Sequence, residues 1–139
     1  MSSITSVLTR EIRDFLNERR FAVLATRNPD GSIQQTVMWY LLEGDTIVMN
    51  TAKGRVKWRN LQGSNQISLC VEDGLKFVTL TGEVEFRDDP GAIDIQRIGR
   101  RYDTEDEVRE AYEKNWHHQH RVTLTMPIKR VVTHGFGED

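Results

Sequence analysis

Cysteine and proline are scarce in this sequence, which has one cysteine (Cys70) and three prolines among 139 residues. A single cysteine excludes an internal disulfide and favours a reducing compartment. No apolar run approaches the roughly 20 residues that a bilayer-spanning helix needs. The N-terminus also lacks the basic segment and following apolar stretch that are typical of a secretory signal. We therefore expect a cytoplasmic protein.

An excess of charge is also missing, because the formal net charge is −2 at pH 7. This balance excludes a general electrostatic attraction to nucleic acid, and the sequence predicts neither a nucleic-acid nor a membrane partner. Hydrophobic residues make up 37% of the chain and charged residues 29%, which is typical of a folded soluble domain. The length provides for one core, so we expect a single domain over residues 1–139.

Hydrophobic periodicity predicts the secondary structure. Apolar residues at three- and four-residue spacing (Ile4, Val7, Leu8, Ile12, Phe15 and Leu16) predict an amphipathic helix over residues 4–20. Short apolar runs between turn residues predict strands over 21–26, 33–42, 46–50, 66–72, 76–87, 121–126 and 128–133, with a bend at Gly82. Further helices are expected at the end of 51–63, over 92–102 and over 104–116, the last with a capping box of Thr104 and Glu107. Tight turns favour antiparallel pairing, so these seven strands indicate a mainly β (α+β) fold with a closed or partly closed barrel.

One segment concentrates positive charge in a chain that is otherwise slightly acidic. Lys53, Arg55, Lys57 and Arg59 lie within seven residues, after a predicted strand and at the start of a predicted helix. Free N–H groups and the helix dipole favour anions at such a helix start. Gly54 lets the backbone approach a ligand closely, and neither the Walker nor the Rossmann glycine pattern is present. The segment predicts a phosphate site of another type, with a solvated basic helix start as the alternative.

Several short motifs follow one another in a recognisable order. They are Leu24-Ala25-Thr26, Asn28-Pro29-Asp30-Gly31, Gln35 with Trp39-Tyr40, Thr51 with Gly54-Arg55, Lys57 and Asn60-Leu61, Ser68-Leu69, and Thr81-Gly82-Glu83-Val84. Over residues 8–133 their order and spacing resemble the pyridoxamine 5′-phosphate oxidase-like FMN-binding split barrels. Within these, the chain is most similar to the small flavin/deazaflavin oxidoreductases, the group that contains F420-dependent reductases.

This resemblance implies a split β-barrel with peripheral helices that acts as a homodimer, with cofactor sites at the interface. The phosphate tail of the cofactor is expected at Thr51, Arg55 and Lys57, and its ring along the strand from Gln35 to Trp39. The FMN oxidases usually carry Ser-Arg-Lys where this chain has Arg55-Val56-Lys57, which favours F420 as the cofactor, with FMN as the alternative. The expected cofactor-binding residues are Gln35, Thr36, Val37, Met38, Asn50, Thr51, Lys53, Gly54, Arg55, Lys57, Asn60 and, near the partner protomer's cofactor, Lys76.

The activity implied is that of an F420-dependent oxidoreductase, which transfers a hydride between the deazaflavin and a small unsaturated organic substrate. The long C-terminal segment with which pyridoxamine phosphate oxidases bind their substrate is absent, so we do not expect that activity. Because a fold does not determine a function, three alternatives stay open: an FMN-dependent oxidoreductase, a non-catalytic carrier of F420, FMN or haem, and a structural or regulatory dimer. The sequence singles out no catalytic acid or base, and the proton donor is a side chain or solvent.

Three histidines, His117, His118 and His120, lie close together after a polar helix. A zinc site needs several imidazole or carboxylate ligands on one side. We interpret the cluster as a polar junction between a helix and a strand and predict no metal. The alternative is that one of these histidines lines the substrate pocket.

Overall fold

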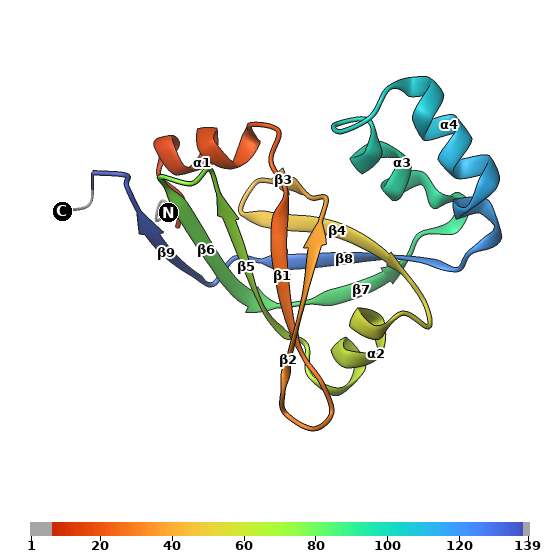
Figure 1. The fold of residues 1–139 in the computed structure, drawn as a ribbon, viewed down its shortest axis with the longest axis horizontal. Helices are drawn as coiled ribbons and strands as arrows, with labels where there is room; N and C mark the ends of the chain where they lie inside the picture. Colours follow the sequence, from red (N-terminus) through yellow and green to blue (C-terminus); the bar gives the residue numbers. More distant parts are fainter. Residues whose placement is uncertain (1–6, 138–139) are drawn as a thin grey trace, which may run out of the picture.

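The computed structural model describes residues 7–137, which form strands, α-helices and two short 3-10 helices (Figure 1). The α-helices are α1 (Arg10–Asn17), α2 (Val56–Gly63), α3 (Ile93–Gly99) and α4 (Glu105–Lys114). The strands are β1 (Ala22–Arg27), β2 (Ile33–Met38), β3 (Leu41–Glu43), β4 (Thr46–Ala52), β5 (Gln66–Glu72), β6 (Phe77–Glu83), β7 (Glu85–Asp88), β8 (Arg121–Pro127) and β9 (Arg130–His134). The 3-10 helices are η1 (Pro90–Ala92) and η2 (Trp116–His118).

The strands form two antiparallel sheets. The five-stranded sheet has the order β2-β1-β5-β6-β9, and the four-stranded sheet has the order β3-β4-β8-β7. The chain passes from one sheet to the other between β2 and β3, between β4 and β5, between β6 and β7, and between β8 and β9. In the described part of the chain no ladder joins the edge strands of the two sheets, so the barrel is split. The expected mainly β split barrel with peripheral helices is confirmed.

The strand predicted over residues 33–42 is in fact two strands, β2 and β3, which lie in different sheets and are separated by Trp39 and Tyr40. Tyr40 is fully buried, and its hydroxyl donates a hydrogen bond to the carbonyl of Leu16 (2.7 Å). Its backbone N–H donates to the hydroxyl of Tyr102 (3.2 Å). These partners are distant in sequence, so the local apolar pattern could not show the break.

The strand predicted over residues 76–87 also divides, into β6 and β7, with Val84 between them. The neighbouring Gly82 packs tightly against β8: a Cβ there would lie 2.5 Å from the carbonyl oxygen of Pro127 and 2.9 Å from Cγ of Met126. Any other residue would clash with this backbone, so glycine permits the close approach of β6 and β8. The expected bend lies next to Gly82, and the two divisions raise the number of strands from seven to nine.

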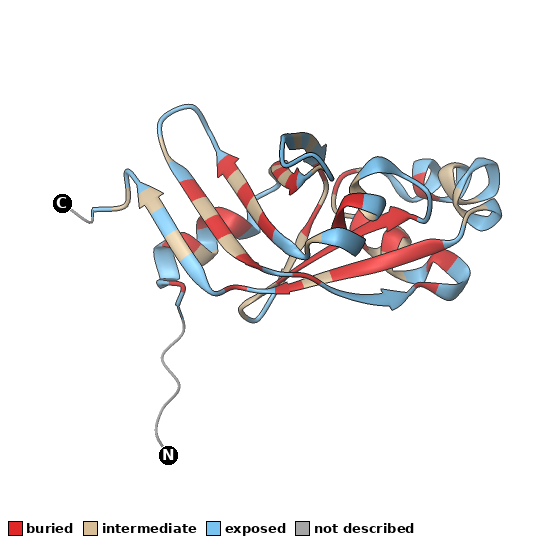
Figure 2. Cartoon of the chain, turned by 90° about the horizontal axis from the view of Figure 1, so that it is seen from below, coloured by how far each residue is buried: buried red, intermediate tan, exposed pale blue. Residues whose placement is uncertain are grey.

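The main core fills the space between the two sheets, where the inward-facing strand residues are buried (Figure 2). Helix α1 covers this core with Ile12, Phe15 and Leu16. Thr9 caps the helix, and its Oγ1 accepts a hydrogen bond from the N–H of Ile12 (3.2 Å). The helix is therefore shorter than the predicted range 4–20; Val7 is 44% exposed, and Ile4 lies outside the described residues.

Helices α3 and α4 lie together at one end of the molecule (Figure 1). Val48 of β4 packs against Ile98 of α3 and against Tyr102, which explains why β4 is buried on both faces although its sequence alternates. The expected capping box of α4 is confirmed, because Thr104 and Glu107 each accept a hydrogen bond from the backbone of the other. No helix within residues 7–137 is both long and apolar enough to cross a bilayer.

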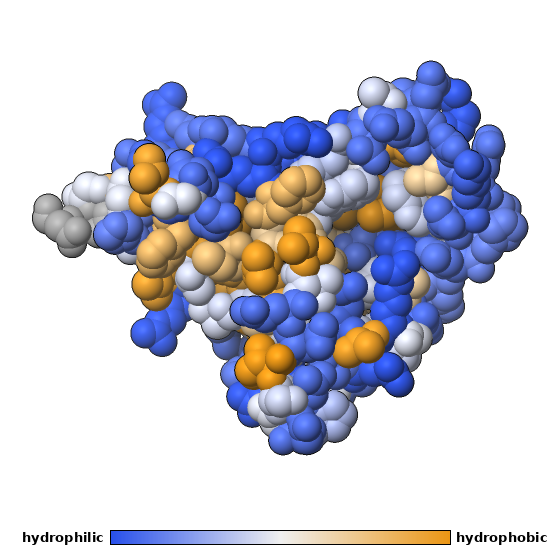
Figure 3. All heavy atoms as spheres, in the orientation of Figure 1, coloured by the Kyte–Doolittle hydropathy of each residue, from blue (hydrophilic) through white to orange (hydrophobic). Residues whose placement is uncertain are grey.

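The outer face of the five-stranded sheet carries exposed apolar residues. The strand registers place Val37, Val23, Cys70, Thr79 and Val132 side by side in one row across β2, β1, β5, β6 and β9. Val37 is 64% exposed and Val132 is 47% exposed. Figure 3 shows apolar side chains gathered over the middle of this view, where β1, β5 and β6 lie in Figure 1. We call the side of the five-stranded sheet that carries this row the outer face.

Candidate functional site

A cavity of about 320 Å³ lies between the end of β2, the start of α2 and the helical segment that precedes β8. Its volume is that of a small-molecule site, for which roughly 300–1,000 Å³ is usual. Strand β2 is an edge strand, so its outer backbone groups take no part in a ladder and can bind a ligand. The cavity is lined by Thr36, Val37, Met38, Trp39, Asn50, Arg55, Lys57, Ile95, Trp116 and Arg121.

Among the described residues, three cations and no carboxylates line this cavity. Burial, together with the nearby charges of Arg55 and Arg121, lowers the pKa of Lys57. Burial and the charge of Arg55 likewise lower the pKa of Arg121 to about 10, although the charge of Asp89 acts in the opposite direction. The positive charges of Arg55, Lys57 and Arg121 thus repel one another in a cavity that is partly shielded from water. A bound anion would reduce this repulsion.

Arg121 is held at the cavity by two neutral side chains. Its Nε donates to Oδ1 of Asn50 (3.0 Å), and its Nη1 donates to Oε1 of Gln119 (2.7 Å). The amide nitrogen of Asn50 in turn donates to Oδ2 of Asp89 (3.0 Å) and to Oγ1 of Thr123 (3.2 Å). The position of the guanidinium therefore depends on a buried network rather than on an ion pair.

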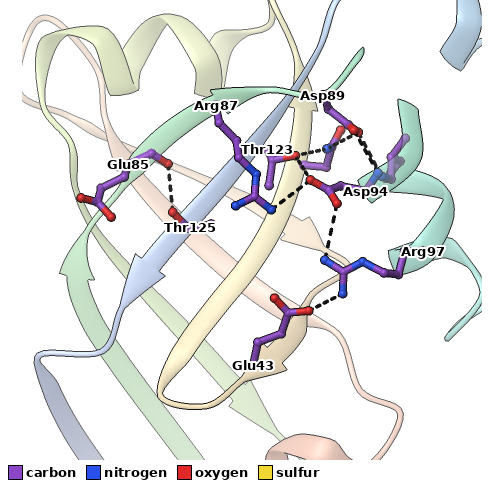
Figure 4. Close-up of polar contacts among 10 residues, drawn as sticks. Glu43, Glu85, Arg87, Asp89, Asp94, Arg97, Thr123 and Thr125 are labelled. Carbon is purple, nitrogen blue, oxygen red and sulfur yellow. Dashed lines mark hydrogen bonds and ion pairs between the residues drawn. The ribbon is translucent and has the colours of Figure 1, made fainter. Parts of the chain in front are cut away.

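The network continues from the cavity to α3. The hydroxyl of Thr123 donates to Oδ2 of Asp94 (2.7 Å), and Arg87 forms an ion pair with the same oxygen (3.1 Å). Arg97 contacts Asp94 (3.5 Å) and also pairs with Glu43 of β3. Figure 4 shows Asp94 between Arg87 and Arg97, with Thr123 beside it. These bonds fix α3, and with it Ile95, against the four-stranded sheet.

Two tryptophans form an aromatic wall of the cavity. The ring of Trp39 stacks on Tyr102 with 5.0 Å between centroids and 8° between planes. Trp116 lies beside Trp39 over Gly99, where a Cβ would be 3.3 Å from Cη2 of Trp116 and 3.6 Å from Cζ3 of Trp39. Gly99 thus leaves room for both rings, and the stack behind Trp39 holds its ring in place. Such a wall suits a planar, apolar part of a ligand.

The sequence profile of the family described as pyridoxamine 5′-phosphate oxidase matches residues 8–131. The chain belongs to the pyridoxamine 5′-phosphate oxidase family. This confirms the family resemblance inferred from the motifs. No curated protein matches the sequence.

Solved structures share the fold of this pyridoxamine 5′-phosphate oxidase family member. An F420 reductase superimposes with a TM-score of 0.78 at 21% identity, over 90% of this chain and 98% of its own. A conserved hypothetical protein from Mycobacterium tuberculosis gives a TM-score of 0.72 at 27% identity, over 96% of this chain and 88% of its own. General Stress Protein 26 from Bacillus anthracis gives 0.66 at 12% identity, over 88% of this chain and 90% of its own.

Half of the residues expected to bind a cofactor line the cavity. They come from β2, from β4 and from the start of α2, and all of them lie within residues 36–57. Their role in cofactor binding stays a prediction. These residues are Thr36, Val37, Met38, Asn50, Arg55 and Lys57.

Four of the other expected residues lie near this cavity but not in its lining. Gln35 is exposed on the outer face of β2, opposite Ala25 of β1. Thr51 is buried on β4, and its Oγ1 has no hydrogen-bond partner among the described residues. Since side chains alternate along a strand, Thr51 lies on the face opposite Asn50. Lys53 and Gly54 are exposed in the turn before α2.

The remaining two expected residues lie farther away. The amide of Asn60 donates to Oγ1 of Thr26 (3.1 Å) and to Oδ1 of Asn28 (2.9 Å), so it ties α2 to the β1–β2 hairpin. Lys76 precedes β6, with its Nζ 5.2 Å from the centre of the Phe136 ring. Neither residue lines the cavity, and the expected contact of Lys76 with a partner protomer's cofactor stays a prediction.

The sequence did not point to Arg121 as a site residue. It opens β8 and pairs with Ala52 at the end of β4, which brings it beside the basic segment. The signal available in the sequence was an arginine at the first position of a predicted strand, and the structure shows this arginine to be 6% exposed. Trp116 and Ile95 also reach the cavity only through the packing of α3 and η2.

A second cavity, of about 360 Å³, adjoins the first, and Arg121 and Trp116 line both. His117 and His120 belong to its lining, and Nε2 of His120 lies 2.9 Å from Oδ1 of Asp88. Within residues 7–137 no group of three or more histidine, cysteine or acidic side chains is placed to hold a metal ion. His118 lies in η2, not on a strand, with its ring 3.7 Å from that of His117.

Proposed function

We propose that this protein is an F420-dependent oxidoreductase that transfers a hydride between the deazaflavin and a small unsaturated organic substrate. The observation that carries the proposal is a cavity with an aromatic wall and with three cations (Arg55, Lys57 and Arg121) that form no ion pair within residues 7–137. A ligand that joins a planar ring to an anionic group matches both parts. When bound, such a cofactor supplies the redox chemistry, and the protein supplies binding, orientation and exclusion of water.

Each part of the cavity has a role in this proposal. Arg55 and Lys57, at the first turn of α2, bind the phosphate together with the backbone N–H groups of the helix start. Trp39 and Trp116 pack against the ring system. The free backbone edge of β2 from Thr36 to Met38 offers hydrogen bonds to the ring edge and sets its orientation.

Two observations favour F420 over FMN. The chain has Arg55-Val56-Lys57 where FMN oxidases of the family usually carry Ser-Arg-Lys. An F420 reductase also shares the fold over nearly all of its length. FMN remains the second candidate, because its phosphate carries a charge of about −1.5 to −2 at neutral pH and would satisfy the same cations.

Titration of the apoprotein with F420 and with FMN, followed by fluorescence, tests the proposal. F420 should bind tighter than FMN by about tenfold or more, a gap of about 1.4 kcal/mol. The reverse preference would identify an FMN-dependent oxidoreductase. Binding of neither would overturn the proposal and favour a structural or regulatory protein.

Turnover separates an enzyme from a carrier of F420, FMN or haem. With reduced F420 in excess and a panel of conjugated organic acceptors, the enzyme should re-oxidise many equivalents of cofactor per protein molecule. Re-oxidation of one equivalent or less with every acceptor, despite tight binding, would favour the carrier. A Soret band on adding haem would identify a haem carrier.

We also propose that two copies associate through the outer face and that the cofactor sites lie at the interface. Val37 supports this, because it belongs both to the exposed apolar row and to the cavity lining. A second copy on the outer face would therefore cover the apolar side chains and close the cavity from that side.

A cytoplasmic location, proposed from the single cysteine, can be checked by cell fractionation.

A further inference from the structure

Arg121 is a buried cation that forms no direct ion pair in the described part of the chain, and the charge of Asp89 acts on it only from beyond ion-pair distance. Arg121 is 6% exposed, and among the described residues no carboxylate lies within ion-pair distance of its guanidinium. Two of its nitrogens donate to neutral side chains, while Nη2 has no hydrogen-bond partner in the described part of the chain. Burying such a charge is costly unless a partner compensates it. The side chain borders both cavities, so a ligand there can supply the missing partner.

The proposed phosphate contacts do not explain this third cation. A phosphodiester carries one negative charge, and Arg55 and Lys57 together already offer two positive ones. Arg121 is the first residue of β8, so a separate strand adds this third positive charge to the cavity. The added charge is repelled by that of Arg55. The charge of Asp89 offsets part of this cost, and a second negative charge entering the cavity would offset more of it.

Building on the proposed function, we infer that the ligand presents two negative charges to this site, one to Arg55 and Lys57 and a second to Arg121. Two chemical sources can provide the second charge. One is the doubly charged phosphomonoester of FMN. The other is a carboxylate in the tail of F420, which extends beyond the phosphodiester.

The second cavity provides space for such a tail, because it continues past Arg121 and Trp116. Two acidic residues line it, but both are already paired. Asp88 contacts His120 (2.9 Å), and the carboxylate of Asp89 accepts hydrogen bonds from Asn50, Asp94 and Ile95. Neither acidic group forms an ion pair with Arg121.

Gln119→Glu tests the inference without removing a buried side chain. The new carboxylate would replace the amide oxygen that already accepts from Arg121 at 2.7 Å and would neutralise the guanidinium from within the protein. We expect affinity for the anionic ligand to fall by about tenfold, typical for a lost charge-assisted contact. Affinity for riboflavin and for the deazaflavin without phosphate and tail should not change. Thermal stability should stay equal or rise, because Arg121 gains a counter-ion.

Gln66→Glu is the matched control, since it adds the same charge at an exposed position of β5 that does not line either cavity. A selective loss of FMN affinity in Gln119→Glu would assign the second charge to a phosphomonoester. A selective loss of F420 affinity would assign it to a tail carboxylate. Unchanged affinity for a cofactor that the wild type binds would overturn this inference alone, whereas wild-type protein that binds neither cofactor would overturn the proposed function as well.

Discussion

The side-chain amide of Asn50 donates a hydrogen bond to the carboxylate of Asp89, with 3.0 Å between nitrogen and oxygen. The same carboxylate accepts from the backbone N–H groups of Asp94 (2.9 Å) and Ile95 (3.1 Å). Asp89 therefore links β4 to the first turn of α3. It also orients Asn50, whose carbonyl oxygen holds Arg121 at the cavity.

Replacement of Asp89 by alanine should destabilise the fold strongly. Its carboxylate is the acceptor of three hydrogen bonds from buried or half-buried donors. A buried donor without an acceptor costs about 1–3 kcal/mol, so we expect the free energy of unfolding to fall by about 3 kcal/mol or more. Guanidinium unfolding followed by tryptophan fluorescence measures this change. Asp106→Ala, at an exposed surface ion pair, is the control, and a loss below about 1 kcal/mol in Asp89→Ala would contradict the prediction.

Removal of either cation at the start of α2 should weaken cofactor binding. Arg55→Ala and Lys57→Ala are each expected to cost about 1.5–3 kcal/mol of binding free energy, the range for a hydrogen bond to a charged group. Fluorescence titration with F420 and FMN measures the loss. Arg59→Ala removes an exposed cation of the same helix that does not line the cavity, so its affinity should stay close to wild type. Unchanged affinity in both Arg55→Ala and Lys57→Ala would exclude the phosphate role.

Local sequence signals predicted the bounds of some elements correctly. The range 66–72 agrees with β5, and the capping box of Thr104 and Glu107 begins α4 as expected. The break at Val84 was expected only as a bend at Gly82 within one strand. The break at Tyr40 was missed, because it is fixed by contacts with residues far away in the sequence. Long-range packing of this kind overrides an alternating apolar pattern.

Only part of the candidate site could be predicted from the sequence. Arg55 and Lys57 stood out because they share a short basic segment, and both line the cavity. Arg121 could not be placed, because its position depends on the pairing of β8 with β4, and its neighbour Gln119 carries no recognisable pattern. Thr51 matches the family motif, yet the alternation of β4 turns it away from Asn50 and the cavity.

Asp94 should make stability depend on pH in the acidic range. Partial burial alone would raise its pKa, but hydrogen bonds from Thr123 and Arg87 and the charges of Arg87 and Arg97 outweigh this and hold the pKa below the ordinary 3.8. A carboxyl with a lower pKa in the folded state stabilises the fold fully above its unfolded pKa, and this contribution is lost as the pH falls through the folded pKa. We therefore expect Asp94→Asn to reduce stability at pH 7 and to flatten the loss of stability below about pH 4. Urea unfolding at a series of pH values compares the two proteins, and parallel curves would contradict the assignment.

Gly82 should not accept a side chain. In Gly82→Ala the new Cβ would meet the carbonyl oxygen of Pro127 at 2.5 Å, and a backbone atom cannot move aside as a flexible side chain can. We expect a loss of about 1–3 kcal/mol in the free energy of unfolding, the usual cost of overpacking. Gly63→Ala is the control, because no atom lies within 4 Å of the new Cβ. Equal stability of the two variants would show that β6 and β8 can separate without cost.

Val37→Glu should dissociate the proposed dimer and weaken cofactor binding together. Val37 lies in the apolar row of the outer face and also lines the cavity, so a charge there would be buried at the interface of two copies. Sedimentation velocity should show a dimer for the wild type and a monomer for the variant. Phe86→Glu places the same charge at an exposed apolar position on the four-stranded sheet and should stay dimeric. Val132→Glu separates the effect on association from the effect on cofactor binding, because it introduces the charge in the same row but away from the cavity lining. If Val132→Glu is monomeric and also binds cofactor less tightly, the second copy completes the site; if it is monomeric with wild-type affinity, one protomer holds the cofactor alone.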